Sequence, residues 1–548
     1  MMGIPRARTF LALNLVYLLY SLHYLVPVPK LFLSMIVNLM IFLLPGIGWI
    51  PLFGRKVRDA VLRTFLVICI SFAATLSGIL LFRAASLEVS SVNLLAFLAV
   101  FTNCGMLLPK VEPPVTSPQV GLSKIRLTQL LLLSVILYLA LFAGAVRIVP
   151  PMEDQDSETQ GTAYGLMHEM VPSMVTNVGV VHFFAHPLLL HFYIGNGFLL
   201  MEELEDVSYY RRSALEGEKI PEGPDRQDRL RRIWERDFQR FLSMPHLLPT
   251  RMANVFFGVL TFYLLFFLLY SSTGSFAAGL SGPLLYFTFP EVFVRSSYGG
   301  YNSIENFCLL LVAYLYAFAD RIDAEEKAKN GAFFVAGLYC AFASQKTAII
   351  ILAMAVLDFA RRDRTLPQRA AACLENRITR GFAAGMALFC VYGMSIDTAL
   401  FVDYYLKGHI LERFHLIAAH HEYTGPVQFH SIPGLWKEFG RHLGFPFLLI
   451  ALPFPLYALF RPRSREGLFG LWFLAGAVLF SVTDWRMTKN LALVILPLLV
   501  APILLVSRSS PWVKAAFLAA AVYVAGNNLA ALFRLARDFS TISPYPFW

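Results

Sequence analysis

Stretches of roughly 20 apolar residues, with few or no charges, alternate with shorter polar connections along the whole chain. A helix of that length crosses about 30 Å of hydrocarbon. The run 276–290 is short and interrupted by Gly and Pro, and the connection 320–330 suits either face. The pattern predicts an all-α polytopic membrane protein with about 13–16 transmembrane helices. The candidate spans are 9–27, 31–53, 60–82, 91–109, 127–149, 186–201, 252–271, 302–319, 331–345, 347–359, 381–399, 445–460, 467–483, 490–507 and 513–533.

Composition supports a membrane protein. Of the 548 residues, 57% are hydrophobic and 15% are charged, whereas soluble globular domains carry about 25% charged residues. These values exclude soluble enzymes, fibrous proteins and disordered chains. The six cysteines show no CxxC spacing and lie mostly inside apolar spans, so we expect free thiols without a disulfide framework or a zinc site.

The net charge of +10 comes from Lys and Arg in the connections between spans, which is typical of membrane topology and not of a nucleic-acid-binding face. With the N-terminus in the cytoplasm, cytoplasmic segments hold 33 of the 46 Lys and Arg residues and outer segments hold 13. The first span follows Arg6 and Arg8 without a cleavage signature, so we expect it to be retained. We expect a multi-pass protein of a bacterial inner membrane, with no nucleic acid as a partner.

Three long polar segments interrupt the membrane pattern. Residues 150–185 and 400–444 form two large outer loops, and 202–251 form a cytoplasmic insert. Within the insert, 225–241 predicts either an amphipathic helix on the membrane or a solvated connector helix. The proline-containing linker 110–126 separates an N-terminal four-span module from a catalytic membrane core, at 1–126 and 127–548.

Ionisable side chains gather in the outer loops and at adjacent helix ends, whereas the interiors of the spans are nearly free of charge. Nine of the twelve histidines lie in or beside the two outer loops. Transporters place ionisable residues within spans, paired across the bundle. The distribution therefore favours an active site at one face of the membrane over a pathway through it.

The first outer loop begins with four acidic residues in six positions, Glu153, Asp154, Asp156 and Glu158. Carboxylates crowded at a bilayer surface raise one another's pKa or bind a divalent cation such as Mg²⁺ or Mn²⁺. Either state suits a general base or a metal-assisted reaction at a phosphate leaving group. The alternative is a solvated acidic turn that caps a helix. We take Asp154, Asp156 and Glu158 as catalytic candidates, and Asp156 and Glu158 as candidate metal ligands.

A helical stretch with small and apolar residues follows the acids, and His186-Pro187-Leu188 opens the next span. This order resembles the GT-C superfamily of integral-membrane glycosyltransferases, which includes lipid A aminoarabinose transferases and protein O-mannosyltransferases. The Asp-Glu doublet of the family reads Asp156-Ser157-Glu158 here, and its proline pair is a single proline. The resemblance covers roughly 127–533 and implies a GT-C-like core with amphipathic helices in the first outer loop.

The same resemblance implies an activity. A GT-C enzyme of this type is an inverting glycosyltransferase that moves a sugar from a polyprenyl-phosphate carrier to a lipid, glycan or protein acceptor at the extracytoplasmic face. No GxxxxGK[ST], GxGxxG or GxSxG site rises above chance, so we expect no nucleotide cofactor.

Three further stretches resemble the same family. AFASQKT (341–347) is similar to the lysine site at a broken helix, and DWRMTKN (484–490) to the basic motif ahead of a late span. PEVFVRSSYGGYNSIENF (290–307) resembles the segment with a second acid, for which Glu291 and Glu305 are the candidates. Basic groups at the outer face could hold the carrier phosphate, although interface anchoring is their ordinary role. The candidates for binding donor phosphate or substrate are His186, Arg295, Lys346, Arg486 and Lys489.

Two other functions remain open. A transporter would need charges within spans. A lipid-linked glycan polymerase or ligase would rely on basic residues of the second outer loop, namely Arg413, His415, Arg441 and His442.

Overall fold

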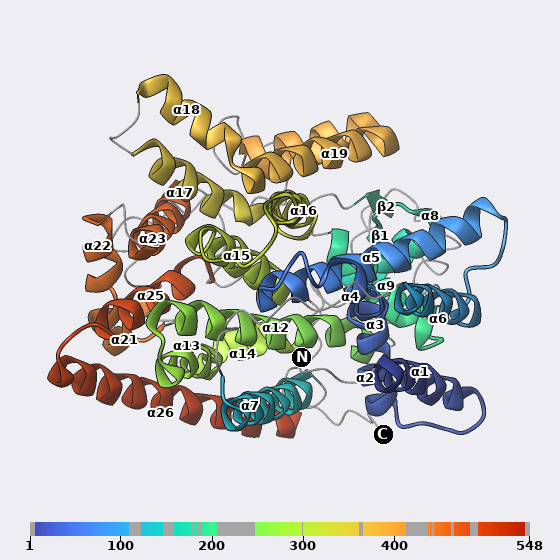
Figure 1. Ribbon diagram of the computed structural model, residues 1–548, viewed down its shortest axis with the longest axis horizontal. Helices are drawn as coiled ribbons and strands as arrows, with labels where there is room; N and C mark the ends of the chain where they lie inside the picture. Colours follow the sequence, from blue (N-terminus) through green and yellow to red (C-terminus); the bar gives the residue numbers. More distant parts are fainter. Residues whose placement is uncertain are drawn as a thin grey trace, which may run out of the picture.

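The computed structural model is helical throughout its described part, apart from one two-stranded hairpin (Figure 1). The predicted all-α class is confirmed. The hairpin pairs β1 (Ser173–Thr176) with β2 (Gly179–His182) in the first outer loop, where no strand was expected. The residues described are 6–108, 122–145, 158–176, 179–182, 188–204, 247–298, 300–360, 365–412, 437, 439–440, 443–461, 465–482 and 492–542.

The α-helices range from four residues in α4 to 32 in α26. The first part of the chain forms α1 (Arg6–Ser21), η1 (Leu22–Tyr24), α2 (Lys30–Phe42), α3 (Leu44–Gly48), α4 (Ile50–Phe53), α5 (Ala60–Ala84), α6 (Ser91–Leu107), α7 (Lys124–Ala143), α8 (Glu158–Glu169) and α9 (Leu188–Leu200). The middle part forms α12 (Leu247–Thr273), α13 (Phe276–Thr288), α14 (Pro290–Ser297), α15 (Asn302–Ala317), α16 (Glu326–Ala343), η4 (Gln345–Thr347), α17 (Ala348–Phe359), α18 (Leu366–Glu375), α19 (Arg377–Leu400) and the π-helix η5 (Phe401–Glu412). The last part forms α21 (Phe445–Ala451), α22 (Pro453–Leu459), α23 (Arg465–Val482), α25 (Ala492–Val506) and α26 (Pro511–Ile542).

Five of the described helices, α5, α7, α12, α19 and α26, are long and apolar enough to cross a membrane. They differ in burial: 78% of the apolar window of α12 lies inside the protein, but only 17% of that of α7 and 6% of that of α26. Helix α12 is therefore the centre of the bundle, whereas α7 and α26 present apolar side chains to lipid. Six further apolar helices have 10–17 residues, and the number of 13–16 crossings stays a prediction.

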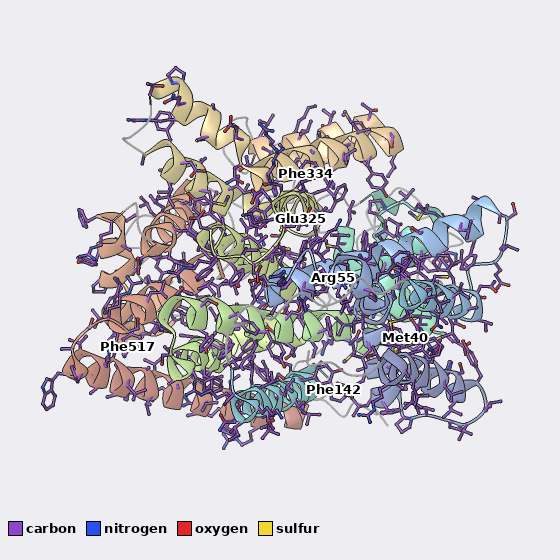
Figure 2. All side chains as sticks on the ribbon, viewed as in Figure 1. Met40, Arg55, Phe142, Glu325, Phe334 and Phe517 are labelled. Carbon is purple, nitrogen blue, oxygen red and sulfur yellow. The ribbon has the colours of Figure 1, made fainter. Side chains whose placement is uncertain are left out.

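The connections between helices define two ends of the bundle. We call the end with the connections 22–29 and 85–90 the first end; there, Tyr24 Oη donates to Ser91 Oγ at 2.9 Å. The second end carries the connections 54–59 and 320–325. Val57 and Ala324 form a β-bridge, and the Glu325 amide donates to the Lys56 carbonyl at 2.7 Å. Arg55 and Glu325 mark these two segments in Figure 2. The connection 320–330, which suits either face by its sequence, thus begins beside 54–59.

The insert 202–251 begins and ends at the first end. Directly after α9, Glu203 Oε1 accepts from Lys30 Nζ at 2.6 Å and Glu202 Oε1 accepts from Ser91 Oγ at 2.9 Å. Helix α12 begins at the same end, where Arg251 Nη1 donates at 2.7 Å to the carbonyl of Ala145, which follows α7. The sequence pattern had placed the insert opposite the connections 22–29 and 85–90, and the structure places its two ends beside them.

The insert lies at the first end because the apolar run 186–201 forms a buried core helix and the run 276–290 forms part of a crossing, the reverse of what their sequences predict. Helix α9 has 13 residues, all of them buried, and it packs on α8 and α12 as a core helix. Helix α13, the run interrupted by Gly and Pro, turns back along the C-terminal half of α12, where the Phe266 and Phe276 rings lie 5.6 Å apart. Helix α14 continues to the start of α12, where Asn254 Nδ2 donates to the Arg295 carbonyl, so that α13 and α14 together supply the missing traverse. The insert contributes ten of the 33 Lys and Arg residues counted as cytoplasmic, and with these ten moved to the first end each end holds 23 of the 46.

Cysteine labelling from one side of the membrane tests this arrangement. A membrane-impermeant maleimide should label Glu88→Cys in the 85–90 connection and Ser213→Cys in the insert from the same side. Lys327→Cys at the start of α16 should be labelled only from the opposite side. The unmodified protein gives the background, since its cysteines lie within helices. Labelling of Ser213→Cys together with Lys327→Cys would contradict the packing of Glu203 on Lys30.

One hydrophobic core joins the N-terminal helices to the rest of the bundle. The Phe42 ring of α2 lies 4.4 Å from the Tyr193 ring of α9 and 4.4 Å from the Phe256 ring of α12. Helix α8 also belongs to this core: Ala163 and Met167 are buried, and Arg83 Nη2 donates to the Met167 carbonyl. The expected amphipathic helix of the first outer loop therefore rests on the protein and not on lipid.

Helices α16 and α19 cross at glycines. A Cβ added at Gly337 would overlap the Ile378 carbonyl oxygen, and one at Gly381 would overlap the Phe334 carbonyl oxygen. Gly385 likewise faces Ala341. The two backbones touch because these positions carry no side chain, which is the close approach that small residues permit in membrane helices.

Candidate functional site

The helical run from α16 to α17 is interrupted by a short non-helical segment at Ser344–Thr347. Ser344 is extended, with φ −163° and ψ 98°, and residues Gln345–Thr347 form a single 3₁₀ turn before α17 begins. The predicted helix break around Lys346 is confirmed. Lys346 Nζ lies 2.7 Å from Glu305 Oε2 and 5.0 Å from the centroid of the Tyr301 ring. The break therefore aims an ammonium group at the first turn of α15.

The Lys346–Glu305 ion pair is almost closed off from solvent, with side-chain exposures of 14% and 7%. Removing one partner of a buried ion pair costs about 3–5 kcal/mol, because the other charge stays buried alone. An apolar pair of similar volume is often at least as stable, so stability alone gives little reason for these charges. Ionisable groups within a membrane bundle are functional candidates by default.

A second cation, Arg295 of α14, lies near the start of α15, where it contacts Tyr298. Its Nη1 donates to Tyr298 Oη at 2.8 Å, and its guanidinium lies 5.2 Å from the centroid of the same ring. Tyr298 Oη in turn donates to Asn302 Oδ1 at 2.7 Å. Glu291 pairs with Arg295 at 3.9 Å along α14 and is more exposed than Glu305. We call the group that surrounds this turn the α15 cluster: Arg295, Tyr298, Tyr301, Asn302, Glu305 and Lys346.

Asn254 of α12 holds the α15 cluster in place. It is fully buried, and its Nδ2 donates to the carbonyls of Arg295 at 2.7 Å and Tyr298 at 2.9 Å. Its Oδ1 accepts from the Ser303 amide at 3.0 Å. Three backbone groups at the turn between α14 and α15 are satisfied by one amide, and each would cost about 1–3 kcal/mol if left buried and unpaired.

The start of α8 contacts the start of α12, close to the α15 cluster. Gln160 Nε2 donates to Thr250 Oγ1 at 3.0 Å, and both residues are buried. Thr250 lies one helical turn before Asn254, a rise of about 6 Å along α12. Gln160 follows the last acid of the first outer loop, Glu158, by two positions. Helix α12 thus brings the end of the acidic segment and the α15 cluster to one corner of the bundle.

The structure therefore brings together part of the predicted site. Arg295, Lys346 and Glu305 meet around one turn, with Glu291 at its edge. Glu158 begins α8, and its side chain lies outside the described part of the structure. The other candidates lie outside the described residues: Asp154, Asp156, His186, Arg486 and Lys489, and for the rival functions Arg413, His415, Arg441 and His442.

Sequence reasoning missed Asn254 and the two tyrosines of the α15 cluster. A signal was present for each. Asn254 is an amide near the start of an otherwise apolar span, and Tyr298 and Tyr301 flank two glycines at the break between two spans. The partners of Asn254 are 41 to 49 positions away, and Lys346, beside Tyr301, lies in another helix-break segment, so hydropathy carries no information on these pairs.

A metal site is not seen among the described residues, where no three His, Cys, Asp or Glu residues are placed to hold an ion. The side chains of the candidate ligands Asp156 and Glu158 are outside that part of the structure. All six cysteines are free thiols.

Comparison with known proteins finds similarity only at the level of structure. Neither a protein-family model nor a curated protein matches the sequence. ArnT from Cupriavidus metallidurans bound to undecaprenyl phosphate is similar with a TM-score of 0.46 and 15% identity, over 78% of this chain and 74% of that chain. The apo state of ArnT gives a TM-score of 0.44 and 15% identity, over 71% and 62% of the two chains.

An archaeal oligosaccharyltransferase is also similar. AglB from Archaeoglobus fulgidus, in complex with an inhibitory peptide and a dolichol-phosphate, gives a TM-score of 0.43 and 13% identity, over 76% of this chain and 56% of that chain. The similarity is to membrane glycosyltransferases of the GT-C family, which the sequence motifs also resemble. At these TM-scores it assigns no role to any residue.

Proposed function

We propose that this chain is a GT-C-type glycosyltransferase that moves a sugar from a polyprenyl-phosphate carrier to an acceptor at the first end of the bundle, which faces the extracytoplasmic side. One observation carries the proposal: α12 places the end of the acidic segment beside the α15 cluster, through Gln160 at Thr250 and Asn254 at the turn before α15. A base and a group of cations at one corner are what this transfer requires.

The cations of the α15 cluster would act on the carrier phosphate. When the bond between the sugar and the phosphate oxygen breaks, negative charge accumulates on the leaving phosphate. Lys346 and Arg295 would stabilise that charge through charge-assisted hydrogen bonds. Glu305 keeps the Lys346 ammonium in position before the lipid arrives. Undecaprenyl phosphate and dolichol-phosphate, present in two of the similar structures, belong to this class of lipid.

The acceptor hydroxyl would lose its proton to a carboxylate of the first outer loop. Asp154, Asp156 and Glu158 are the candidates, and Glu158 stands nearest in the chain to the buried Gln160. A carboxylate in this role contributes about 10²–10⁴ to the rate. Asp156 and Glu158 are also the groups that would hold a divalent cation, Mg²⁺ or Mn²⁺, because carboxylate oxygens are the ligands these ions prefer.

A transporter is the second candidate, and the same ion pair favours it. The sequence indicated spans almost free of charge, but the structure contains a buried pair of opposite charges between helices, as membrane transporters do. The two functions differ in chemistry: a transporter moves its substrate without breaking a covalent bond in it.

Sugar transfer by the purified protein tests the proposal. Incubation with a panel of polyprenyl-phosphate sugars should consume at least one donor and release polyprenyl phosphate, measured by mass spectrometry. A boiled sample is the control. If no donor is consumed while proteoliposomes show flux of a solute, the transporter replaces the glycosyltransferase.

A further inference from the structure

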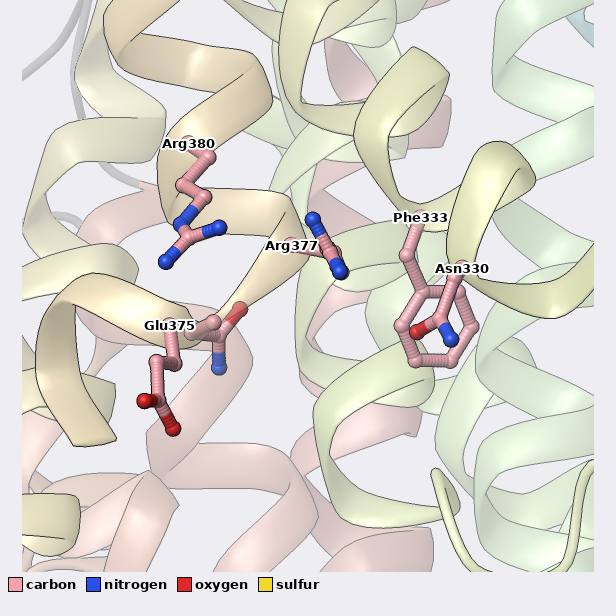
Figure 3. Close-up of a pocket in the computed structure, with 6 residues that line it drawn as sticks. Asn330, Phe333, Glu375, Arg377 and Arg380 are labelled. Atoms are coloured by element: carbon pink, nitrogen blue, oxygen red, sulfur yellow. The ribbon is translucent and has the colours of Figure 1, made fainter. Parts of the chain in front are cut away.

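Helix α19 accompanies α16 from the start of both helices to the break at Lys346. At their starts the two helices line one pocket, with Phe333 on α16 and Arg377 on α19 (Figure 3). Farther along they touch at the glycine crossing. Near the end of α16 the Phe342 and Phe389 rings lie 6.2 Å apart. The segment that follows α19 therefore begins beside the break.

That segment is a π-helix. Asp397, near the end of α19, is extended, with φ −156° and ψ 101°, and its Oδ1 accepts from the Leu400 amide at 2.9 Å. The π-helix η5 then runs over 12 residues, Phe401–Glu412, at the start of the predicted second outer loop. Helices of this type are rare, rarely exceed a single turn and are frequent at functional sites. Helix η5 is therefore a candidate functional element.

Two aromatic rings hold η5 against α19. Phe401 and Tyr405, one turn apart, are 0% and 2% exposed, and their rings stack with centroids 5.1 Å apart. Both rings also contact the Phe389 ring, at 5.9 and 5.2 Å. The Phe401 ring lies directly on Gly393, where an added Cβ would overlap it. Helix η5 is thus packed on α19 through a buried aromatic cluster.

Tyr405 joins η5 to both sides of the break. On the side of α16, Phe342 packs on the same aromatic cluster. On the side of η4, Tyr405 Oη donates to Gln345 Oε1 at 2.7 Å. Gln345 is the first residue of the 3₁₀ turn and directly precedes Lys346. The Tyr405 hydroxyl therefore holds the turn from which the Lys346 ammonium reaches Glu305.

The turn has no side-chain cap of its own. Ser344 precedes η4 and Thr347 precedes α17, and both residue types are favoured at such positions because their hydroxyls accept from backbone amides. Neither side chain makes that bond here. The turn is held instead through Gln345, which bonds to η5, and Lys346, which bonds to α15.

We propose that Tyr405 is a positioning residue for the carrier phosphate: through Gln345 it fixes the 3₁₀ turn so that the Lys346 ammonium meets the phosphate. This inference rests on the proposed function. Glu305 holds the ammonium itself, and Tyr405 holds the backbone that carries it. A displacement of about 1 Å at a binding group is enough to weaken its action strongly. In this role η5 acts through Lys346 and touches neither donor nor acceptor.

Binding of undecaprenyl phosphate to the full-length protein in detergent tests the inference, with the Kd measured by native mass spectrometry. Tyr405→Phe keeps the ring and removes only the hydroxyl, and it should raise the Kd about tenfold. Gln345→Met should raise the Kd by a similar factor. The double variant should be no worse than either single variant, because the two groups form one bond. A smaller folded fraction leaves the Kd unchanged, so this readout separates position from folding.

Hydrogen exchange of the peptide 341–350 examines the turn without any ligand. Its amides should exchange faster in Tyr405→Phe than in wild type, because the turn has lost its bond to η5. Tyr17→Phe is the matched control: the Tyr17 hydroxyl is also buried and lies 2.7 Å from Thr102 Oγ1, between α1 and α6 and away from the break. It should change neither the Kd nor the exchange of this peptide.

The outcomes distinguish this inference from the proposed function. If wild type binds undecaprenyl phosphate and Tyr405→Phe binds it equally well, Tyr405 is structural only and the inference alone fails. Unchanged exchange at 341–350 in Tyr405→Phe would also overturn it, since the bond would then not hold the turn. If wild type itself does not bind undecaprenyl phosphate, the proposed function fails and the inference fails with it.

Discussion

Lys346→Met is expected to reduce consumption of the polyprenyl-phosphate sugar by at least about 100-fold, because it removes the ammonium group proposed to stabilise the leaving phosphate. The same substitution leaves Glu305 buried without its partner, which should lower the free energy of unfolding by about 3–5 kcal/mol. Donor consumption and thermal unfolding in detergent, measured on the same preparation, record the two effects.

A double variant separates the effect of Lys346 on sugar transfer from its effect on folding stability. In Lys346→Met with Glu305→Gln, the buried carboxylate becomes a neutral amide, so the midpoint of thermal unfolding should recover most of its loss. Donor consumption should not recover, since the cation is still absent. If the double variant regains both stability and transfer, the pair is structural only and the carrier phosphate is held elsewhere. Arg508, which pairs with the buried Glu466, offers a matched control: Arg508→Met breaks an ion pair of 2.7 Å away from the α15 cluster and should leave transfer intact.

Of the three candidate bases, Asp156 and Glu158 are replaced first, and either Asp156→Ala or Glu158→Ala should lower the transfer rate by about 10²–10⁴. The physical reason is that the acceptor hydroxyl is a poor nucleophile until a carboxylate takes its proton. The midpoint of thermal unfolding should be unchanged in whichever of the two variants loses activity. Initial rates of donor consumption at saturating acceptor measure the effect.

Glu88→Ala is the control for this experiment, since Glu88 is an exposed acid at the same end of the bundle. If neither Asp156→Ala nor Glu158→Ala changes the rate, Asp154 is the next carboxylate to replace. If that variant is also active, the chemistry moves to the basic residues of the second outer loop, and the polymerase or ligase becomes the better function.

The break at Lys346 could be predicted from the sequence, but its partner could not. AFASQKT places polar residues between two apolar runs, and no helix crosses a bilayer there without exposing them. Glu291 and Glu305 were equal candidates because both lie in the same short segment. Only the packing of α15 on η4 distinguishes them, and it joins residues 41 positions apart.

The placement of the insert shows a limit of another kind. The run 186–201 and the run 276–290 are both apolar and short, and hydropathy ranks the first as the better span. A run of 10–14 residues is also the length of a buried core helix. Tertiary contacts decide between these outcomes: Glu203 meets Lys30 at the first end, and α13 packs on the C-terminal half of α12.

The glycine crossing of α16 and α19 has a consequence for how this sequence can diverge. Mutation can change most of α26 freely, because its apolar side chains face lipid and any apolar residue serves there. At Gly337 and Gly381 even an alanine would meet a carbonyl of the opposite helix. Helix α16 ends just before Lys346, so these two glycines fix how closely the backbone that leads to Lys346 approaches α19. Among homologues that differ almost everywhere else, they are the positions at which we expect a single residue type.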